Sequence, residues 1–144
     1  MATTRRAEVT WSGDLLHGAG TITRVGSGSF GPLDVTWASR SEAPDGRTSP
    51  EELIAAAHAS CYSMALSNGL AGDGHAPERL DVTATVTFVP GTGVTQSALT
   101  VVGKVPGLDA AAFEAAASAA KDGCPVSKAL AGNVELSVEA RLEN

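Results

Sequence analysis

Two cysteines are the residues of this chain best suited to chemistry, and they lie in different local settings. Cys61 lies within an alanine-rich run from Glu51 to Leu66, and Cys124 lies in a Gly-Cys-Pro-Val-Ser segment near the other end. Because a thiolate attacks electrophiles and two thiols form and release a disulfide, the pair suggests redox chemistry. Two inert, reduced thiols of a protein core are the alternative that the residues alone leave open.

Cys61 needs a nearby cation to become a nucleophile. Its stretch of chain is apolar, and burial among apolar neighbours raises the pKa of a thiol and makes it inert. Within the helix that the run predicts, the only possible cation is His58, so a cation must come from another segment. The preceding loop contains Arg40 and Arg47, and these two arginines are therefore the candidates.

A buried arginine in turn needs a carboxylate partner, and Glu51 is the candidate. An acidic residue is equally favourable at a helix N-terminus without any further role. Glu51 and Cys61 are about 15 Å apart along one helix at 1.5 Å per residue, too far for one arginine to contact both. We therefore hypothesise that the central helices of two subunits pack antiparallel, so that Glu51 of one approaches Cys61 of the other. A stable, fully active monomer would contradict this hypothesis.

Cys124 has a different local environment. It lies between Gly123, which is expected to end one helix, and Pro125, which suits the first turn of the next. At such an N-cap position the helix dipole lowers the pKa of a thiol. Local electrostatics therefore favour Cys124 as the more ionised thiol, although a small capping residue without chemistry explains the position equally well.

Hydrophobic periodicity and capping signals predict an α+β fold in a single domain over residues 1–144. Ser49 as N-cap, Pro50 at N1 and Glu52 in a capping box begin the central helix, which we expect to run to about Leu70. Asp109 is expected to cap a second helix that ends at Gly123 as its C′ glycine, and a short helix follows to residue 130. Strands are predicted at residues 7–11, 21–25, 33–37, 81–88, 97–105 and, antiparallel to its neighbour, 134–142, with a loop at 40–48.

Composition narrows the class of protein. The chain is 43% hydrophobic and 18% charged, which is typical of a folded protein. Its net charge of −6 disfavours nucleic acid and anionic membrane surfaces as partners. Neither an apolar signal segment nor a membrane-length apolar run is present, so we expect a cytoplasmic protein. In that compartment a functional cysteine pair forms transient disulfides and not structural ones.

Two further motifs are considered and set aside. Residues 26–31 match the glycine pattern of dinucleotide-binding loops, but Pro32 and a β-rich run follow where a helix would be required. His58 and Cys61 lie three residues apart on one helical face, yet further metal ligands would have to come from Cys124, His17, His75 or a distant carboxylate. We therefore expect no metal and no cofactor.

Two long segments, 49–66 and 123–130, resemble the OsmC/Ohr family of thiol peroxidases (osmotically inducible protein C and organic hydroperoxide resistance protein). They occur in the family's order, and the likeness extends over nearly the whole chain, including Trp11-Ser-Gly-Asp. His58 favours the OsmC branch, because the Ohr branch usually has tyrosine there. The resemblance implies antiparallel sheets around a buried central helix, in an intertwined homodimer with active sites at the subunit interface.

The resemblance also implies roles for individual residues. Cys61 is expected to be the peroxidatic thiol and Cys124 the resolving thiol, an order opposite to the one that local electrostatics favour. Glu51 matches the family's active-site glutamate. Arg40 resembles the OsmC-type arginine, and Arg47 is the alternative because the loop after Arg40 is about one residue longer here.

The implied reaction is the reduction of organic hydroperoxides, and of hydrogen peroxide, through a sulfenic acid and a disulfide. The apolar surroundings of Cys61 favour alkyl or lipid hydroperoxides. A thiol, either a dithiol such as lipoyl or a low-molecular-weight thiol, would recycle the enzyme. A redox-sensing or ligand-binding dimer without turnover and a structural dimer with idle thiols are the alternatives.

Overall fold

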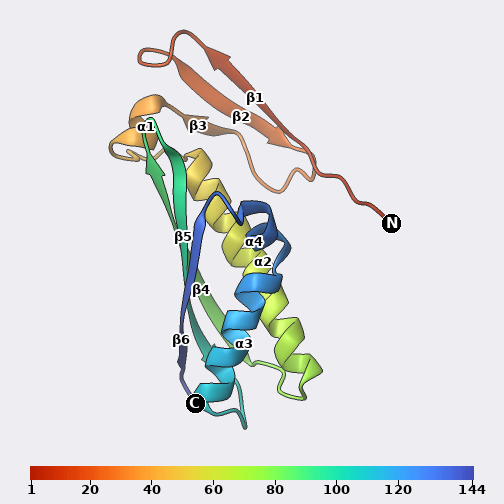
Figure 1. The fold of residues 1–144 in the computed structure, drawn as a ribbon. Coiled ribbons are helices and arrows are strands. Elements are labelled where there is room, and N and C mark those ends of the chain that lie inside the picture. The colour runs from red at the N-terminus through yellow and green to blue at the C-terminus, as the bar shows by residue number, and fades with distance from the viewer. The chain divides into compact units, whose positions relative to one another are not determined.

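The computed structural model describes residues 1–144 and divides them into two compact units, Met1–Leu53 and Ile54–Asn144. Each unit contains one three-stranded sheet, and helices join and cover the strands of the second (Figure 1). The α+β class predicted from the sequence is confirmed. None of the helices combines the length and apolar character that a membrane crossing requires.

The first unit is built on an antiparallel sheet with the order β1-β2-β3. Its strands are β1 (Ala7–Ser12), β2 (Ala19–Val25) and β3 (Leu33–Val35). Strand β1 is exposed along its whole length, and its Val9 and Trp11 retain 59% and 40% of their accessible surface. The alternation of apolar residues that predicted this strand therefore marks a face that the single chain leaves uncovered.

A short helix, α1 (Trp37–Ser41), follows β3 and corrects the sequence prediction. We expected a strand through Trp37 and a loop from Arg40, but Thr36 and Ser39 form a capping box that begins a helix instead. The Thr36 side chain accepts from the Ser39 N–H at 3.0 Å, and the Ser39 hydroxyl accepts from the Thr36 N–H at 2.9 Å. This local exchange of hydrogen bonds places Arg40 in the last turn of α1.

The long helix α2 (Pro50–Gly72) begins in the first unit and continues into the second. Ser49 caps it as predicted, accepting the Glu52 N–H at 3.1 Å. The reciprocal half of the predicted capping box does not form, because the Glu52 carboxylate accepts from the Thr48 hydroxyl at 2.8 Å. The helix ends at Gly72, close to the predicted end.

The second unit contains strands β4 (Arg79–Val89), β5 (Gly93–Lys104) and β6 (Glu135–Leu142), in the order β4-β5-β6. β4 and β5 form an antiparallel hairpin, whereas β6 pairs with β5 in parallel. The prediction of an antiparallel final strand was therefore wrong. Helices α3 (Ala110–Gly123) and α4 (Pro125–Leu130) form a crossover between β5 and β6, and a crossover is what a parallel pair requires (Figure 1).

Helix α3 begins as predicted and ends differently. Asp109 caps it, accepting the Ala112 N–H at 2.8 Å. Gly123 is the last helical residue and has no positive φ, so it is not the left-handed C′ glycine that we expected. Cys124 follows in an extended conformation, with φ of −61° and ψ of 129°, and serves both as C-cap of α3 and as N-cap of α4.

The core of the second unit lies between its sheet and its helices (Figure 1). Its buried members are Tyr62, Leu66, Leu70, Leu99, Val101, Val105, Phe113, Ala117, Ala120 and Cys124. The Tyr62 hydroxyl donates to the Ala117 carbonyl at 3.0 Å and links α2 to α3. Cys61 packs against this core while Cys124 belongs to it. Core packing therefore holds the two segments that carry the thiols, the middle of α2 and the junction of α3 and α4.

Candidate functional site

The two cysteines meet in the second unit. Cys61 comes from the middle of α2, Cys124 from the junction of α3 and α4, and their thiols interact by a side-chain hydrogen bond. Both are free thiols; Cys124 is buried and Cys61 is partly exposed. The two thiols are therefore neighbours, as a disulfide between them requires.

The Cys61 thiol is held in its protonated form within the single chain. Burial raises its pKa, and the hydrogen bond and charge of Cys124 raise it further. The N–H of Val126 acts in the opposite direction but does not reverse the shift. No cation contributes to these effects, so this chain's second unit alone does not activate Cys61.

The Cys124 thiol has the opposite shift. Burial acts to raise its pKa, but the Ser127 N–H, the Cys61 thiol, the Ser127 hydroxyl and the Val126 N–H together bring it below the ordinary value. The Cys124 side chain makes no cap hydrogen bond, so the lowered pKa comes from several contributions together at the start of α4. The local sequence argument for Cys124 as the more ionised thiol therefore holds in the folded unit.

Arg40 and Glu51 form an ion pair in the first unit. Arg40 Nε donates to both carboxylate oxygens of Glu51, at 3.0 and 3.2 Å, and Nη2 donates to Oε1 at 2.8 Å. The Glu51 side chain is only 9% exposed, so the carboxylate is largely removed from water. Such multiple hydrogen bonds hold the guanidinium plane in one orientation.

Arg47 has a different partner. Its guanidinium contacts Asp45 at 3.5 Å, and both side chains are exposed. Of the two arginines that the sequence singled out, Arg40 is thus the one paired with the predicted glutamate. The four predicted site residues consequently form two pairs, one in each unit, with Arg40 and Glu51 in the first and the thiols in the second.

His58 is a polar residue of the core whose partners the sequence did not reveal. The ring is fully buried, with Nδ1 2.6 Å from the Ser97 hydroxyl and Nε2 2.8 Å from the Ser127 hydroxyl. Burial lowers its pKa, which keeps the imidazole neutral. The only sequence signal was a histidine on an otherwise apolar helix face, and the serines come from β5 and α4. Since both ring nitrogens bond to serines, no nitrogen is left to hold a metal with Cys61.

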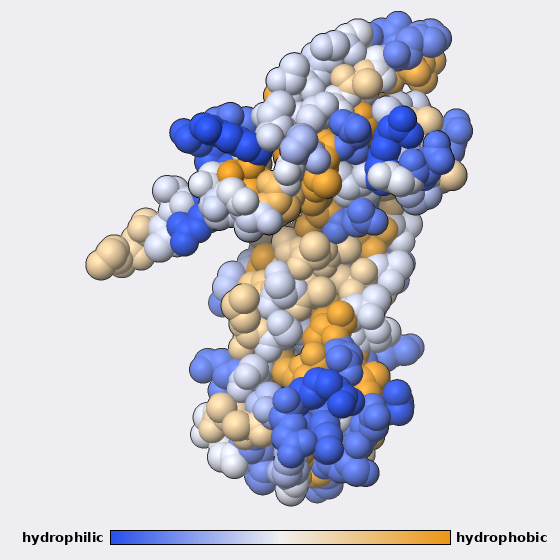
Figure 2. Space-filling view, turned by 180° about the vertical axis from the view of Figure 1, so that it is seen from behind, coloured by the Kyte–Doolittle hydropathy of each residue, from blue (hydrophilic) through white to orange (hydrophobic).

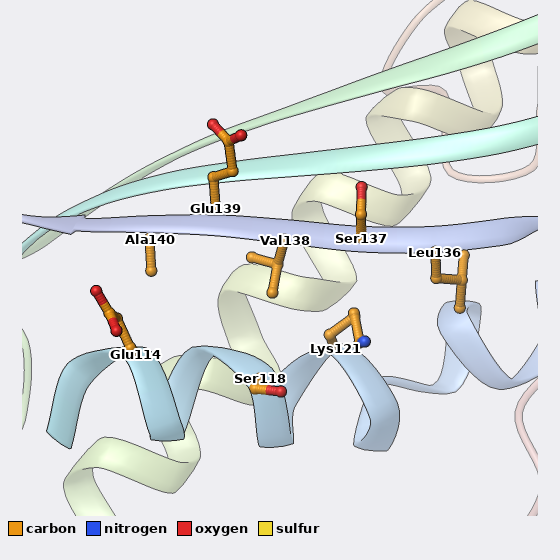
Figure 3. A pocket seen from close by; sticks show the side chains of 8 residues that line it. All are labelled: Glu114, Ser118, Lys121, Leu136, Ser137, Val138, Glu139 and Ala140. Atoms are coloured by element: carbon orange, nitrogen blue, oxygen red, sulfur yellow. The ribbon is translucent and has the colours of Figure 1, made fainter. Parts of the chain in front are cut away.

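A surface hollow lies between α3 and β6 (Figure 3). It is lined by Glu114, Ser118, Lys121, Leu136, Ser137, Val138, Glu139 and Ala140. Leu136, Val138 and Ala140 point from the strand toward α3, whereas Ser137 and Glu139 point to its other side (Figure 3). No cysteine or histidine lines this hollow, and it offers no nucleophile for the predicted chemistry.

Comparisons with known proteins agree with this fold. The family described as OsmC-like protein matches residues 43–139. The chain is 38% identical over 140 residues to the Peroxiredoxin OsmC of Escherichia coli (strain K12), covering 95% of this chain and 96% of that protein.

Solved structures show the same fold. The organic hydroperoxide resistance protein OhrB of Bacillus subtilis has a TM-score of 0.69 and 25% identity, covering 94% of this chain and 98% of that one. An organic hydroperoxide resistance protein OsmC from Legionella pneumophila also has a TM-score of 0.69, with 22% identity, covering 97% of this chain and 99% of that one.

The likeness to a curated peroxiredoxin over nearly the whole chain shows the class of protein, and the chain is a thiol peroxidase. More narrowly, the chain belongs to the OsmC family. The resemblance that its two cysteine segments suggested is confirmed, including the branch that His58 favoured.

Proposed function

We propose that the chain reduces organic hydroperoxides, and hydrogen peroxide, with Cys61 as the peroxidatic and Cys124 as the resolving cysteine. The interaction between two free thiols, one of them partly exposed, is the observation that carries this proposal. A peroxidatic thiol must be reached by substrate, and Cys61 is the more accessible of the two. A resolving thiol must be near but protected, as buried Cys124 is.

The proposed cycle has three steps. The Cys61 thiolate attacks one peroxide oxygen, the O–O bond breaks, and the leaving alkoxide takes up a proton as alcohol while Cys61 becomes a sulfenic acid. The Cys124 sulfur then attacks the Cys61 sulfur; the S–S bond forms, the S–O bond breaks and water leaves. An external thiol reduces the disulfide by exchange.

Arg40 is proposed to supply the cation that the first step requires. The raised pKa of Cys61 means that a positive charge must stabilise its thiolate, and a guanidinium also polarises the bound peroxide. The hydrogen bonds to Glu51 orient Arg40 for this task. The exposed contact of Arg47 with Asp45 makes Arg47 the weaker candidate.

A homodimer is proposed to complete the site, with Glu51 and Arg40 of one subunit near Cys61 of the other. Support comes from apolar surface that the single chain leaves open: Val9 and Trp11 on β1, and Met64, 70% exposed, on α2. Figure 2 likewise shows hydrophobic residues reaching the surface between groups of hydrophilic ones. Exposed apolar surface of this kind is typical of protein interfaces.

The reductant is proposed to be a dithiol such as lipoyl or a low-molecular-weight thiol. Exchange with the disulfide begins at the more accessible sulfur, which is that of Cys61. The compartment is proposed to be the cytoplasm, where thiols are kept reduced and disulfides are transient.

The test is the thiol-dependent consumption of cumene hydroperoxide by the wild type, Cys61→Ser and Cys124→Ser. We expect complete loss in Cys61→Ser, and in Cys124→Ser one rapid turnover followed by loss of recycling through the disulfide. Unchanged consumption by Cys61→Ser would refute the assignment. A wild type that forms the disulfide once but does not turn over would identify a redox sensor instead.

A further inference from the structure

A buried chain of hydrogen bonds runs from β5 through α2 to α4. The Ser97 hydroxyl bonds His58 Nδ1 at 2.6 Å, and His58 Nε2 bonds the Ser127 hydroxyl at 2.8 Å. His58 and Ser97 have no accessible surface, and Ser127 retains 1%. The cycle described above uses none of these three side chains. Burying polar groups costs free energy, so a fully buried network of this kind suggests a role of its own.

Ser127 extends this chain toward Cys124. Cys124 is the N-cap of α4 and Ser127 is the third helical residue, and side chains at these two positions ordinarily face each other. Both the hydroxyl and the N–H of Ser127 act on the Cys124 thiol. The complete path is therefore Ser97, His58, Ser127 and Cys124.

The hydroxyl of Ser127 suits either protonation state of Cys124. When Nε2 accepts the Ser127 hydroxyl proton, the oxygen lone pairs of Ser127 face outward to accept the thiol proton of Cys124. When Nε2 carries a proton and donates it to Ser127, the hydroxyl turns to donate to the Cys124 thiolate. One network thus has a stable arrangement for the thiol and another for the thiolate.

Cys124 needs such a path because it has no accessible surface, so water does not reach its proton directly. The titratable groups Cys61 and Tyr62 share α2 with His58, and burial raises the pKa of both, which keeps them protonated. No ion pair involves His58, whose polar partners are two neutral hydroxyls. The imidazole therefore holds an additional proton only briefly.

We propose that Ser127 and His58 form a proton relay for Cys124 in the resolving step, with Ser127 in contact with the reacting thiol and His58 as a positioning residue behind it. This inference rests on the proposed function of the two cysteines. The thiol proton passes to Ser127 Oγ while the Ser127 hydroxyl proton passes to His58 Nε2. The Cys124 electron pair forms the S–S bond with Cys61 and the S–O bond of the sulfenic acid breaks. The departing hydroxide takes up the proton that His58 returns through Ser127, so water leaves and the imidazole is neutral again.

The experiment separates the two chemical steps in a single turnover. Reduced full-length protein is mixed with one equivalent of cumene hydroperoxide, and Cys61 sulfenic acid and the disulfide are followed by rapid quench and mass spectrometry. For Ser127→Ala we expect disulfide formation at least about tenfold slower, because general-base assistance commonly contributes 10²–10⁴-fold. The sulfenic acid should accumulate, and the deficit should shrink as the pH rises, since hydroxide then ionises the thiol.

Two further variants distinguish a relay from a packing role. Ser127→Thr keeps a hydroxyl and is expected to restore most of the rate. Ser97→Ala removes a hydrogen bond from the same buried ring without interrupting the path to Cys124, so its loss should be clearly smaller. Equal slowing in Ser97→Ala and Ser127→Ala at every pH, or a disulfide rate within twofold of the wild type in Ser127→Ala, would overturn the relay.

A second readout does not depend on peroxidase activity. In a Cys61→Ala background, the thiolate absorbance of Cys124 is titrated with and without Ser127→Ala. The relay predicts a higher titration midpoint without the hydroxyl, and an unchanged midpoint contradicts it. If the wild type forms no sulfenic acid at Cys61 but this shift is present, the proposed function fails while the contact between Ser127 and Cys124 stands.

Discussion

The surroundings of the two thiols differ in accessibility and in charge stabilisation. Cys124 is buried at the start of α4, where N–H groups and a hydroxyl favour its thiolate. Cys61 is partly exposed in the middle of α2, where burial and its neighbour favour the thiol. The more ionised sulfur is thus the less accessible one, and the accessible sulfur lacks the charge that would activate it.

This difference shows what one chain does not provide. A peroxidase needs accessibility and activation on the same sulfur, and here they are divided between two. The ion pair of Arg40 and Glu51 contains the missing positive charge in an oriented form. We therefore interpret the chain as half of an active unit in which a second subunit activates the accessible thiol, and each prediction below tests part of that interpretation.

The largest expected effect is on the cysteines themselves. Cys61→Ser should lose steady-state hydroperoxide consumption by at least about 10³-fold, as removal of a catalytic nucleophile typically does. Cys124→Ser should retain the first oxidation in a burst measurement. A similar loss of that burst in both variants would remove the functional distinction between the two thiols.

Arg40 is the next test of the comparison. Arg40→Met should lower kcat/KM for cumene hydroperoxide by about 10²-fold, because it removes the charge proposed to stabilise the thiolate and the developing oxyanion. It should also raise the pKa of Cys61 further, measured by the pH dependence of its alkylation. Arg47→Met is the matched control and should stay within about twofold of the wild type. Equal losses in the two variants would show that Arg40 has no special role.

The dimer is tested on the exposed face of α2. Met64→Glu places a charge on an apolar surface that the proposed subunit contact would bury. We expect the dimer dissociation constant to rise at least about tenfold in light scattering, with activity falling in parallel. Glu114→Gln, a change on α3 that adds no charge, serves as the control. Full activity in a purely monomeric Met64→Glu would refute a shared site.

A smaller effect concerns the pH dependence of the free energy of unfolding, through the buried His58. Because burial lowers the pKa of His58, the unfolded chain binds a proton more readily than the folded one. Stability should be fully present above the ordinary histidine pKa of about 6.5 and fall below it, by at most about 1.4 kcal/mol per pH unit. Urea unfolding between pH 7.5 and 5 measures this slope. His58→Gln should be less stable at pH 7.5 and should lack most of the slope; an unchanged slope would assign it to other groups.

Local signals in the sequence predicted much of the fold. Ser49 and Asp109 both cap the helices that they were expected to cap, because an N-cap acts over only three residues. The direction of β6 was not predictable in this way, since it depends on how the crossover returns the chain to the sheet. The exposure of β1 was missed because an alternating strand signals a buried face without saying which chain buries it.

In the candidate site, too, local residue chemistry was predictable from the sequence, whereas contacts set by tertiary packing were not. Residue chemistry indicated that Cys61 lacks a cation and that Arg40 or Arg47 would pair with Glu51. The family resemblance favoured Arg40, which is the one that pairs with Glu51. It did not indicate that His58 bonds two serines from distant segments, because such a network depends on the tertiary packing of α2, β5 and α4. The order of the two cysteines came from the family resemblance, and the pKa directions within one chain oppose it.

The site of the first oxidation tests the central claim most directly. Cys61→Ser and Cys124→Ser are each treated with one equivalent of cumene hydroperoxide and a sulfenic-acid-trapping dione, and the labelled cysteine is identified by peptide mass spectrometry. Our account predicts rapid labelling of Cys61 in Cys124→Ser and little or no labelling of Cys124 in Cys61→Ser. Labelling of Cys124 at a comparable rate would contradict it, because the more ionised thiol would then be the peroxidatic one.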